Sequence, residues 1–379
     1  MKRDDALIVG GGPVGLATAI ALRAEGLAVT VLDARRPLID KACGEGLMPD
    51  AVEWLERHGI ERDRLRGVSL RGIRYLDGER VAEGAFDGGS GLGVRRTELH
   101  RALVATAESR GIELEWGTRV TGLIDGRLQT PSGRRSAAWL VGADGLDSRI
   151  RRWSGLDREV RKKESSRRRT GLRRHFRTAP WTDLVEVYWT NEREAYVTPV
   201  AEDEVGVAIL QSGQPLPFES ALESFPRLIR KLGGAAPASR VRGGGPLDRR
   251  ARDLVRANLA LVGDAAGYRD AITGEGLALG FHLADALARA VAAQDLARYR
   301  SEARRLMRLP FALIGLLLFV ERHPGLRRRL IDAFAGDSEL FDRFLAVHAR
   351  QRPPLSIGVG GAVRLAAGMV GAARATSAG

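Results

Sequence analysis

The sequence of 379 residues contains a single cysteine, Cys43, so it can form no intramolecular disulfide and lacks the composition of a disulfide-stapled secreted protein. Long apolar runs are also missing. The longest, residues 309–320, has an early proline and falls short of the roughly twenty residues that a membrane-crossing helix needs. The first five residues lead directly into an apolar segment, which leaves no room for the apolar part of a signal peptide. We therefore expect a cytoplasmic protein.

Acidic residues are outnumbered, because 60 lysines and arginines face 47 aspartates and glutamates, which gives a formal net charge of +13. This excess favours anionic partners, whether nucleic acid, acidic lipid headgroups or an acidic carrier protein. The densest stretch, residues 161–177, has nine basic residues but only one aromatic, whereas nucleic-acid modules usually interleave aromatics on a basic face. We expect no nucleic-acid partner and interpret the stretch as a solvated linker followed by a half-exposed strand.

The feature that is present from the start is a glycine loop. Residues 7–9 are an apolar run that enters Gly-x-Gly-x-x-Gly, and residues 28–32 are a second apolar run that ends at an acid. The first glycine can take a positive φ, the second has no Cβ to block a pyrophosphate, and the third lets the following helix pack on the strand. The acid can accept hydrogen bonds from ribose hydroxyls. The predicted dinucleotide site comprises Gly10, Gly12, Pro13, Gly15 and Asp33; a glycine-rich turn without a nucleotide is the alternative.

Two segments far downstream fit the same kind of site. Residues 137–141 form a strand-like run that leads into Asp144, and residues 259–262 form another that leads into Gly263 and Asp264. A carboxylate at the end of a buried strand can accept a ribityl hydroxyl, and the N–H groups of a helix start can face the pyrimidine edge of a flavin. Flavin needs both contacts and nicotinamide nucleotides do not, so the sequence predicts FAD and no metal. The helix start contains Gly274, Gly276 and Leu277.

These motifs together resemble those of a known flavoprotein superfamily. The Asp-Gly-x-x-Ser-x-x-Arg spacing from Asp144 is similar to the second fingerprint of the para-hydroxybenzoate-hydroxylase-type flavoproteins, and Arg96 begins a matching Arg-x-x-Leu-x-x-x-Leu pattern. Residues 41–47 and 273–276 look like geranylgeranyl reductases and their relatives, which include flavin-dependent halogenases and hydroxylases. The resemblance covers roughly residues 1–295. It implies that Arg96 and Asp144 lie near the cofactor and that Asp264 contacts the ribityl chain.

The chain also departs from its relatives' patterns. Prenyl reductases carry Tyr-x-Trp-x-Phe-Pro, of which this chain retains Tyr196 and Pro199 without the Trp or Phe. The signature tryptophans of halogenases are absent from the same segment, and Gly267 stands where aromatic hydroxylases usually have His. These differences disfavour halogenation and weaken the case for polyprenyl reduction.

The expected fold is α/β, with a Rossmann-like FAD-binding domain, an inserted antiparallel β-sheet substrate domain and a C-terminal helical region. The FAD-binding domain is assigned to residues 1–60, 94–160 and 250–295, the substrate domain to residues 61–93 and 161–249, and the helical region to residues 296–379. Strands are expected at residues 170–177, 184–190, 194–200 and 205–211. The apolar residues 309–320 and 357–370 are expected to pack on the body of the fold, with docking on a membrane surface as the alternative.

No second strand-glycine-helix unit is present, so NADPH or NADH is expected to visit as a transient reductant. The leading hypothesis is a monooxygenase of secondary metabolism that hydroxylates a hydrophobic aromatic or polyketide-like substrate through a flavin hydroperoxide. The alternatives are a flavin-dependent reductase of isoprenoid double bonds and a non-catalytic flavin-fold binding module. His175, Tyr196 and Glu45 are unranked candidates for a base that polarises a phenol. Cys43 either lies beside the flavin and tunes an intermediate or is an inert buried side chain.

Overall fold

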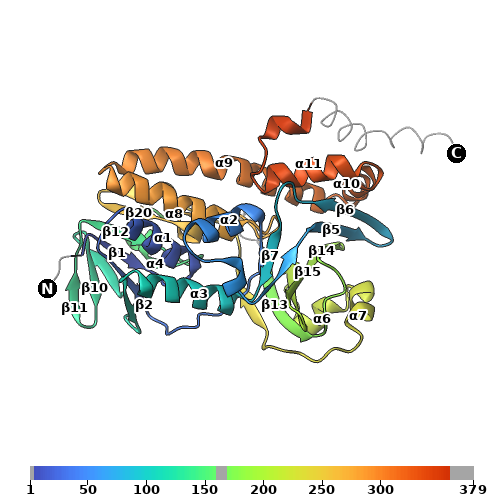
Figure 1. The fold of residues 1–379 in the computed structure, drawn as a ribbon, viewed down its shortest axis with the longest axis horizontal. Coiled ribbons are helices and arrows are strands. Elements are labelled where there is room, and N and C mark those ends of the chain that lie inside the picture. Colours follow the sequence, from blue (N-terminus) through green and yellow to red (C-terminus); the bar gives the residue numbers. More distant parts are fainter. Residues whose placement is uncertain (1–3, 159–168, 359–379) are drawn as a thin grey trace.

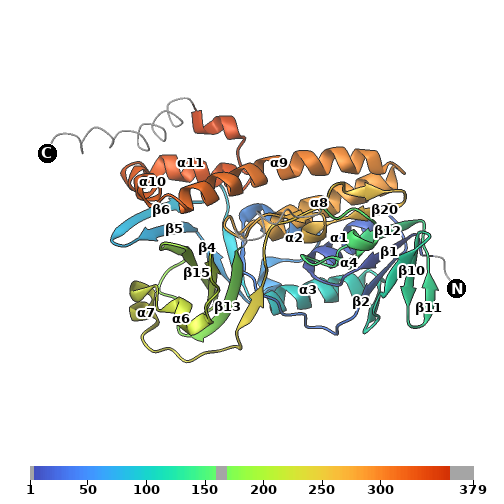
Figure 2. The ribbon, with the colours of Figure 1, turned by 180° about the vertical axis from the view of Figure 1, so that it is seen from behind.

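The computed structural model describes residues 4–158 and 169–358. The chain forms two lobes side by side, with the first sheet in one lobe and the second sheet in the other (Figure 1). The long helix α9 (Leu296–Glu321) lies along α8 (Gly276–Ala292) in the first lobe and leads to the helices that cover the second (Figures 1 and 2).

The first lobe is built on a six-stranded sheet in the order β19-β20-β12-β1-β2-β8. All neighbouring pairs from β20 to β8 are parallel, and the edge strand β19 is antiparallel to β20. Both faces of the central strands are buried, which is why these strands are continuous apolar runs in the sequence. The strands are β1 (Ala6–Val9), β2 (Val29–Asp33), β8 (Glu113–Trp116), β12 (Trp139–Gly142), β19 (Val255–Arg256) and β20 (Leu259–Leu261).

Helices cover this sheet and position its carboxyl edge. Helix α1 packs against α3 and α8, and Phe281 of α8 stacks on Trp54 of α2 with ring centroids 4.6 Å apart. Because the five parallel strands run in the same direction, the loops that follow β1, β2, β12 and β20 meet at one edge of the sheet. The helices are α1 (Pro13–Ala24), α2 (Pro49–Arg57), α3 (Arg96–Ser109) and the short α4 (Arg149–Trp153).

The second lobe is a seven-stranded sheet in the order β17-β13-β16-β15-β14-β5-β6. The four strands predicted from the sequence are present, but the sheet is mixed, because β14 and β5 pair in parallel. The strands are β5 (Gly72–Asp77), β6 (Arg80–Ala85), β13 (Thr170–Arg177), β14 (Leu184–Trp189), β15 (Arg193–Ala201), β16 (Glu204–Gln211) and β17 (Arg242–Gly244). Helices α6 (Phe218–Leu222) and α7 (Pro226–Leu232) lie against this sheet (Figure 2).

Smaller sheets complete the fold. One joins the lobes and comprises β3 (Gly46–Leu47), β7 (Gly91–Val94) and β4 (Gly67–Leu70). Another comprises β9 (Gly122–Ile124), β10 (Arg127–Thr130) and β11 (Gly133–Arg135), and a third pairs β18 (Arg249–Arg250) with β21 (Gly267–Tyr268). Short 3-10 turns occur at Arg62–Arg64, Gly263–Ala265 and Pro354–Ile357.

The C-terminal helices α10 (Pro324–Gly336) and α11 (Ser338–His348) cover β5 and β6 with an aromatic core. The apolar residues 309–320 lie within α9, where Ile314 and Leu317 are buried but Leu316 and Phe319 are 46% and 52% exposed. Within the described ranges, no helix combines the length and apolar character needed to cross a membrane. The second apolar stretch, residues 357–370, lies outside the described residues from residue 359 onward.

Candidate active site

The glycine loop has the geometry that its sequence predicts. Gly10 has a φ of +114°, and a Cβ built on Gly15 would lie 1.8 Å from the carbonyl oxygen of Gly10, so helix and loop touch without room for a side chain. A Cβ on Gly12 would meet no atom within 4 Å, because this residue faces open space at the start of α1. Asp33 accepts hydrogen bonds from the backbone N–H groups of Gly11 and Arg35, each at 2.8 Å. The loop can therefore hold a pyrophosphate at the helix N-terminus.

The second motif connects the loops that follow β12 and β20. The Asp144 carboxylate accepts hydrogen bonds from Ser148 Oγ and from the backbone of Arg149 and Ile150, so it shapes the turn and caps α4. Ser148 accepts a bond from the N–H of Arg151, as an N-cap residue does. The guanidinium of Arg151, only 1% exposed, donates to the carbonyl oxygens of Asp264 and Ala265. Arg151 was not among the predicted site residues, although it is the last residue of the quoted motif.

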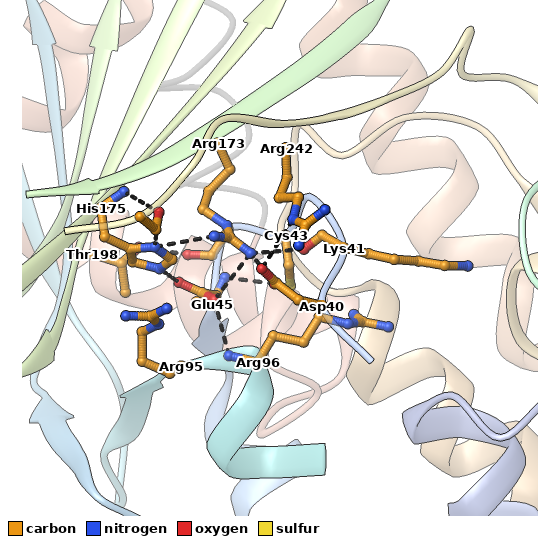
Figure 3. Close-up of polar contacts among 12 residues, drawn as sticks. Asp40, Lys41, Cys43, Glu45, Arg95, Arg96, Arg173, His175, Thr198 and Arg242 are labelled. Atoms are coloured by element: carbon orange, nitrogen blue, oxygen red, sulfur yellow. Dashed lines mark hydrogen bonds and ion pairs between the residues drawn. The ribbon is translucent and has the colours of Figure 1, made fainter. Parts of the chain in front are cut away.

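Charged side chains converge where these loops meet. Burial lowers the pKa of Lys41, and the neighbouring cations Arg35 and Arg96 lower it further. Burial also raises the pKa of Asp264, although Lys41 and Arg96 oppose this rise. Arg96 Nε is buried without a hydrogen-bond partner among the described residues, and Lys41 and Arg96 extend in the same direction (Figure 3). Two partly buried cations beside a glycine loop, one of them with an unmet donor, fit the pyrophosphate of a dinucleotide.

A cavity of about 250 Å³ begins at this charged edge and extends to the second sheet. Gly12, Gly274, Gly276 and Leu277 line its cofactor end, and the opposite wall is mainly apolar. The apolar wall includes Leu70, Ile73, Phe86, Val185, Val187 and Leu210. All four predicted catalytic candidates come close to this cavity: Cys43, Glu45 and Tyr196 line it, and His175 contacts Glu45.

Glu45 is the centre of a buried polar network (Figure 3). Its Oε2 lies 2.5 Å from His175 Nε2, and its Oε1 accepts the backbone N–H of Arg96 at 2.9 Å. Arg173 lies 3.8 Å from Oε1 and also binds Asp40, which pairs with Arg242 nearer the surface. Glu45, His175 and Arg173 are each at most 3% exposed.

The donors in this network fix the protonation of its members. Arg173 Nη1 lies 3.0 Å from His175 Nδ1, and a guanidinium can only donate. Ser239 Oγ lies 2.8 Å from the same nitrogen and can either donate or accept. An accepting Nδ1 satisfies both neighbours, and it places the proton of a neutral imidazole on Nε2, where it is donated to Glu45. Glu45 is then an anion whose two oxygens are already occupied by donors. This makes it an anchor for the loop of residues 43–46 rather than a free base.

The prediction about the basic stretch at residues 161–177 can now be assessed. Residues 161–168 lie outside the described residues, but Arg169 and Arg173 are buried in ion pairs. The expectation of a solvated linker is therefore wrong for Arg169, whereas Arg173 is buried on a strand whose last residue, Arg177, is exposed. The cause is that acids from distant segments converge on these arginines.

Cys43 is half-buried and accepts the N–H of Glu45 at 3.4 Å. No cluster of metal-ligating side chains occurs in the described part of the chain.

His348 and Glu194 also contribute to the site and were not predicted. His348 comes from α11, is 2% exposed, and lines the cavity with Nε2 3.7 Å from Glu275 Oε1. Burial lowers the pKa of His348. Glu194 is completely buried beneath Tyr196. Glu194 could have been suspected from its alternation with Tyr196 on one strand, whereas no motif pointed to His348.

The fold and the converging loops define a flavoprotein of the dinucleotide-binding type. Residues 3–306 match a family described as FAD binding domain, and the chain belongs to this family. It is an FAD-dependent oxidoreductase.

Curated relatives include proteins of different activities. A putative 2-heptyl-3-hydroxy-4(1H)-quinolone synthase of Rhodococcus erythropolis is 28% identical over 62% of this chain and 65% of its own length, just under two thirds. A digeranylgeranylglycerophospholipid reductase of Methanosarcina acetivorans is 30% identical over 72% of this chain and 71% of its own.

The solved structures support the fold. The structure of PqsL, described as a probable FAD-dependent monooxygenase from Pseudomonas aeruginosa, matches with a TM-score of 0.66 and 20% identity. The match covers 93% of this chain and 100% of that one.

Proposed function

We propose that this FAD-dependent oxidoreductase is a monooxygenase that hydroxylates a hydrophobic aromatic or polyketide-like substrate. The observation that carries the proposal is the cavity, which has a volume of about 250 Å³ and a mainly apolar wall opposite the glycine loop. Ligand pockets of a few hundred Å³ suit compact molecules held by apolar walls and a few polar groups. The apolar wall suits a hydrophobic ring system held against the cofactor end of the cavity.

The cofactor residues follow from the same geometry. Gly12 and the start of α1 are proposed to hold the pyrophosphate of FAD, with Lys41 and Arg96 as counter-charges and Asp33 at the adenosine ribose. Asp264 is proposed to hold the ribityl chain, and the start of α8 at Gly276 to face the pyrimidine edge. Bound FAD supplies the redox chemistry, with NADPH or NADH proposed as the transient reductant.

The chain's own residues have positioning roles in this proposal. The apolar wall excludes water from the reacting face, which strengthens the electrostatic interactions inside. Arg151 fixes the carbonyl oxygens of residues 264 and 265, so the Asp264 carboxylate is held in one place. Glu45 ties the loop that carries Cys43 to α3 and β13.

The second candidate is a flavin-dependent reductase of isoprenoid double bonds. It is favoured by the similarity to the Methanosarcina reductase and by Cys43, which lies in the reductase-like segment and lines the cavity. The two candidates differ in what receives the electrons. A monooxygenase passes them to oxygen and adds one oxygen atom to the substrate, whereas a reductase adds two hydrogens and needs no oxygen.

The deciding experiment is rapid mixing of the anaerobically reduced holoenzyme with oxygen, in the presence of candidate phenols and quinolones. We expect a transient absorbance species before the oxidised spectrum returns, and a product that has gained one oxygen atom from labelled oxygen gas. Slow, featureless reoxidation together with anaerobic reduction of a geranylgeranyl compound would overturn the monooxygenase and favour the reductase. A purified protein that binds no FAD would favour the binding module.

We also propose that α9 docks on an anionic membrane surface. Arg305, Arg308, Leu316, Phe319 and Arg322 are exposed at helical spacing, so an apolar centre is flanked by positive charge. In a flotation assay, the protein is expected to float with phosphatidylglycerol vesicles and not with phosphatidylcholine vesicles. Phe319→Ser should weaken retention, and Ile124→Ser, which changes another 52%-exposed apolar side chain, should not. Equal recovery with both vesicle types would overturn membrane docking and turn attention to an acidic carrier protein.

A further inference from the structure

Glu194 and Tyr196 form a pair on one face of β15 beside the cavity. Tyr196 lines the cavity, and its hydroxyl oxygen lies 2.8 Å from Glu194 Oε2 and 2.8 Å from the carbonyl oxygen of Ile272. Residues two apart on a strand point to the same side, which is why the two side chains meet. Glu194 is fully buried, and Ile272 also lines the cavity.

If Glu194 is ionised, the Tyr196 hydroxyl has too few hydrogens for its two short contacts, with Glu194 and with the carbonyl oxygen of Ile272. A tyrosine hydroxyl has one hydrogen, while a carboxylate and a carbonyl oxygen can only accept. With Glu194 ionised, Tyr196 satisfies one of its two neighbours and leaves the other acceptor facing it. With Glu194 protonated, Oε2 donates to the Tyr196 oxygen and the Tyr196 hydrogen is donated to Ile272. The neutral acid therefore satisfies both short contacts.

The charges around Glu194 also favour its neutral form. Among the described residues, Arg169 is the cation in contact with it, at 3.1 Å from Oε1, and Arg169 also binds Asp270 at 3.2 Å. Glu321 at the end of α9 adds a third carboxylate to this buried group, and Tyr75 of β5 faces it without charge. Burial is the largest cause that raises the pKa of Glu194, and Asp270 and Glu321 raise it further, whereas Arg169 and the Tyr196 hydroxyl lower it. The resulting pKa is about 7.

A matched pair on the neighbouring strand makes the contrast clear. Glu186 and Tyr188 of β14 have the same spacing, and Tyr188 donates to Glu186 Oε2 at 2.6 Å. Glu186, however, binds both Arg74 and Lys231, and Trp181 donates to it as well. These donors outweigh its burial and lower its pKa. Glu186 is thus an ionised carboxylate on the face opposite the cavity-lining Val185 and Val187.

We propose that Glu194 is held as a neutral acid and that Tyr196, backed by it, presents a hydrogen-bond donor to an oxygen atom of the ligand in the cavity. The inference rests on the proposed function in taking this cavity as the substrate site. The Tyr196 hydroxyl turns from Ile272 to a phenolic or carbonyl oxygen of the ligand. If the proton moves, the Tyr196 O–H bond breaks as the ligand O–H bond forms, and Glu194 returns a proton to Tyr196. The electron pair of the Glu194 O–H bond stays on its carboxylate beside Arg169.

Infrared difference spectroscopy on the oxidised holoenzyme tests the protonation state. A carboxylic acid band should be present below neutral pH and should vanish as the pH rises through about 7. Glu194→Gln should remove this band, and the matched control Glu186→Gln should leave it unchanged. No titrating acid band in the natural protein, or a band that persists in Glu194→Gln, would overturn the proposal.

Binding of 4-nitrophenolate, followed by its absorbance, tests the donor. Tyr196→Phe should weaken binding about tenfold, the effect of losing one hydrogen bond to a charged oxygen. Once the probe's own ionisation near neutral pH is taken into account, Glu194→Gln should bind the phenolate form equally well at all pH values, because its amide N–H donates to Tyr196 without titrating. The natural protein should lose affinity for that form above neutral pH. Tyr196→Phe binding as well as the natural protein, or natural pH dependence in Glu194→Gln, would refute the role of the pair.

These two measurements need no turnover. They hold or fail regardless of whether the substrate gains oxygen or hydrogen. Failure of the oxygen-mixing experiment would therefore leave the assignment of Glu194 and Tyr196 standing, and failure here would leave the proposed reaction standing.

Discussion

Replacing Glu45 with glutamine tests whether this residue is the ionised anchor of the loop at residues 43–46. Its two carboxylate oxygens accept from the N–H of Arg96 at 2.9 Å and from His175 Nε2 at 2.5 Å, and Arg173 lies 3.8 Å away. Glutamine has a single acceptor oxygen, so its NH₂ group must face one of these donors. The Arg96 backbone N–H cannot reverse its role. His175 could do so only by placing its hydrogen on Nδ1, which lies 3.0 Å from the Arg173 guanidinium and 2.8 Å from Ser239 Oγ.

The expected cost combines two effects. A buried donor without an acceptor costs about 1–3 kcal/mol. Breaking a buried ion pair costs about 3–5 kcal/mol when one partner is removed, but Arg173 keeps Asp40, so this loss is partial. We expect Glu45→Gln to lower the free energy of unfolding by about 3 kcal/mol. Urea unfolding followed by circular dichroism measures this loss.

The control is Glu98→Gln, which removes one partner of a surface pair with Arg101. Surface pairs contribute about 0–1 kcal/mol, so this variant should be nearly as stable as the natural protein. Glu45→Gln should also speed alkylation of Cys43, because the loop that holds its thiol is released. If Glu45→Gln unfolds at the same urea concentration as Glu98→Gln, the reasoning about donors is refuted.

Three further predictions use other parts of the site. Gly12→Ala should fold but purify with little bound flavin, because its Cβ enters open space, whereas Gly15→Ala should also lose stability through a 1.8 Å clash; flavin content and thermal unfolding distinguish the two. Arg151→Lys should weaken FAD binding about tenfold, because a lysine cannot hold both carbonyl oxygens at residues 264 and 265; fluorescence titration of the apoprotein measures this. The pKa of Glu194 is raised from 4.5 to about 7, so the stability that its neutral form gives is complete below about pH 4.5 and is lost as the pH rises through 7. Glu194→Gln should remove about 3 kcal/mol from the pH dependence of the free energy of unfolding. An unchanged pH dependence in urea titrations of this variant would contradict the prediction.

The strands and the glycine loop could be predicted from the sequence because their causes are local. The positive φ of Gly10 and the close packing of Gly15 are requirements of one tight turn, and the apolar runs reveal buried parallel strands. The parallel pairing of β14 with β5 could not be predicted, because nothing in either strand specifies a partner more than a hundred residues away.

The buried charges depend on such distant partners as well. Arg169 was expected in a solvated linker, since its acids, Glu194 and Asp270, lie far away in the sequence. Periodicity places a charged side chain on one face of a strand, but it does not identify the residues that pack against that face. The expectation of a solvated stretch failed at Arg169 for that reason. Glu45 and His175 were both among the predicted catalytic candidates, and the structure brings their side chains into contact.

Glu45 and Glu194 are both buried beside the cavity, and their surroundings favour opposite protonation states. Glu45 is surrounded by a histidine N–H, a backbone N–H and an arginine, all donors, so its charge is stabilised. Glu194 shares one arginine with Asp270 and faces a hydroxyl whose only hydrogen is needed elsewhere, so its neutral form is stabilised. Paired carboxyl groups held in different states are a general means of dividing acid and anchoring roles within one site. An acid that donates through Tyr196 is therefore a better candidate for proton chemistry than Glu45, whose lone pairs are already occupied.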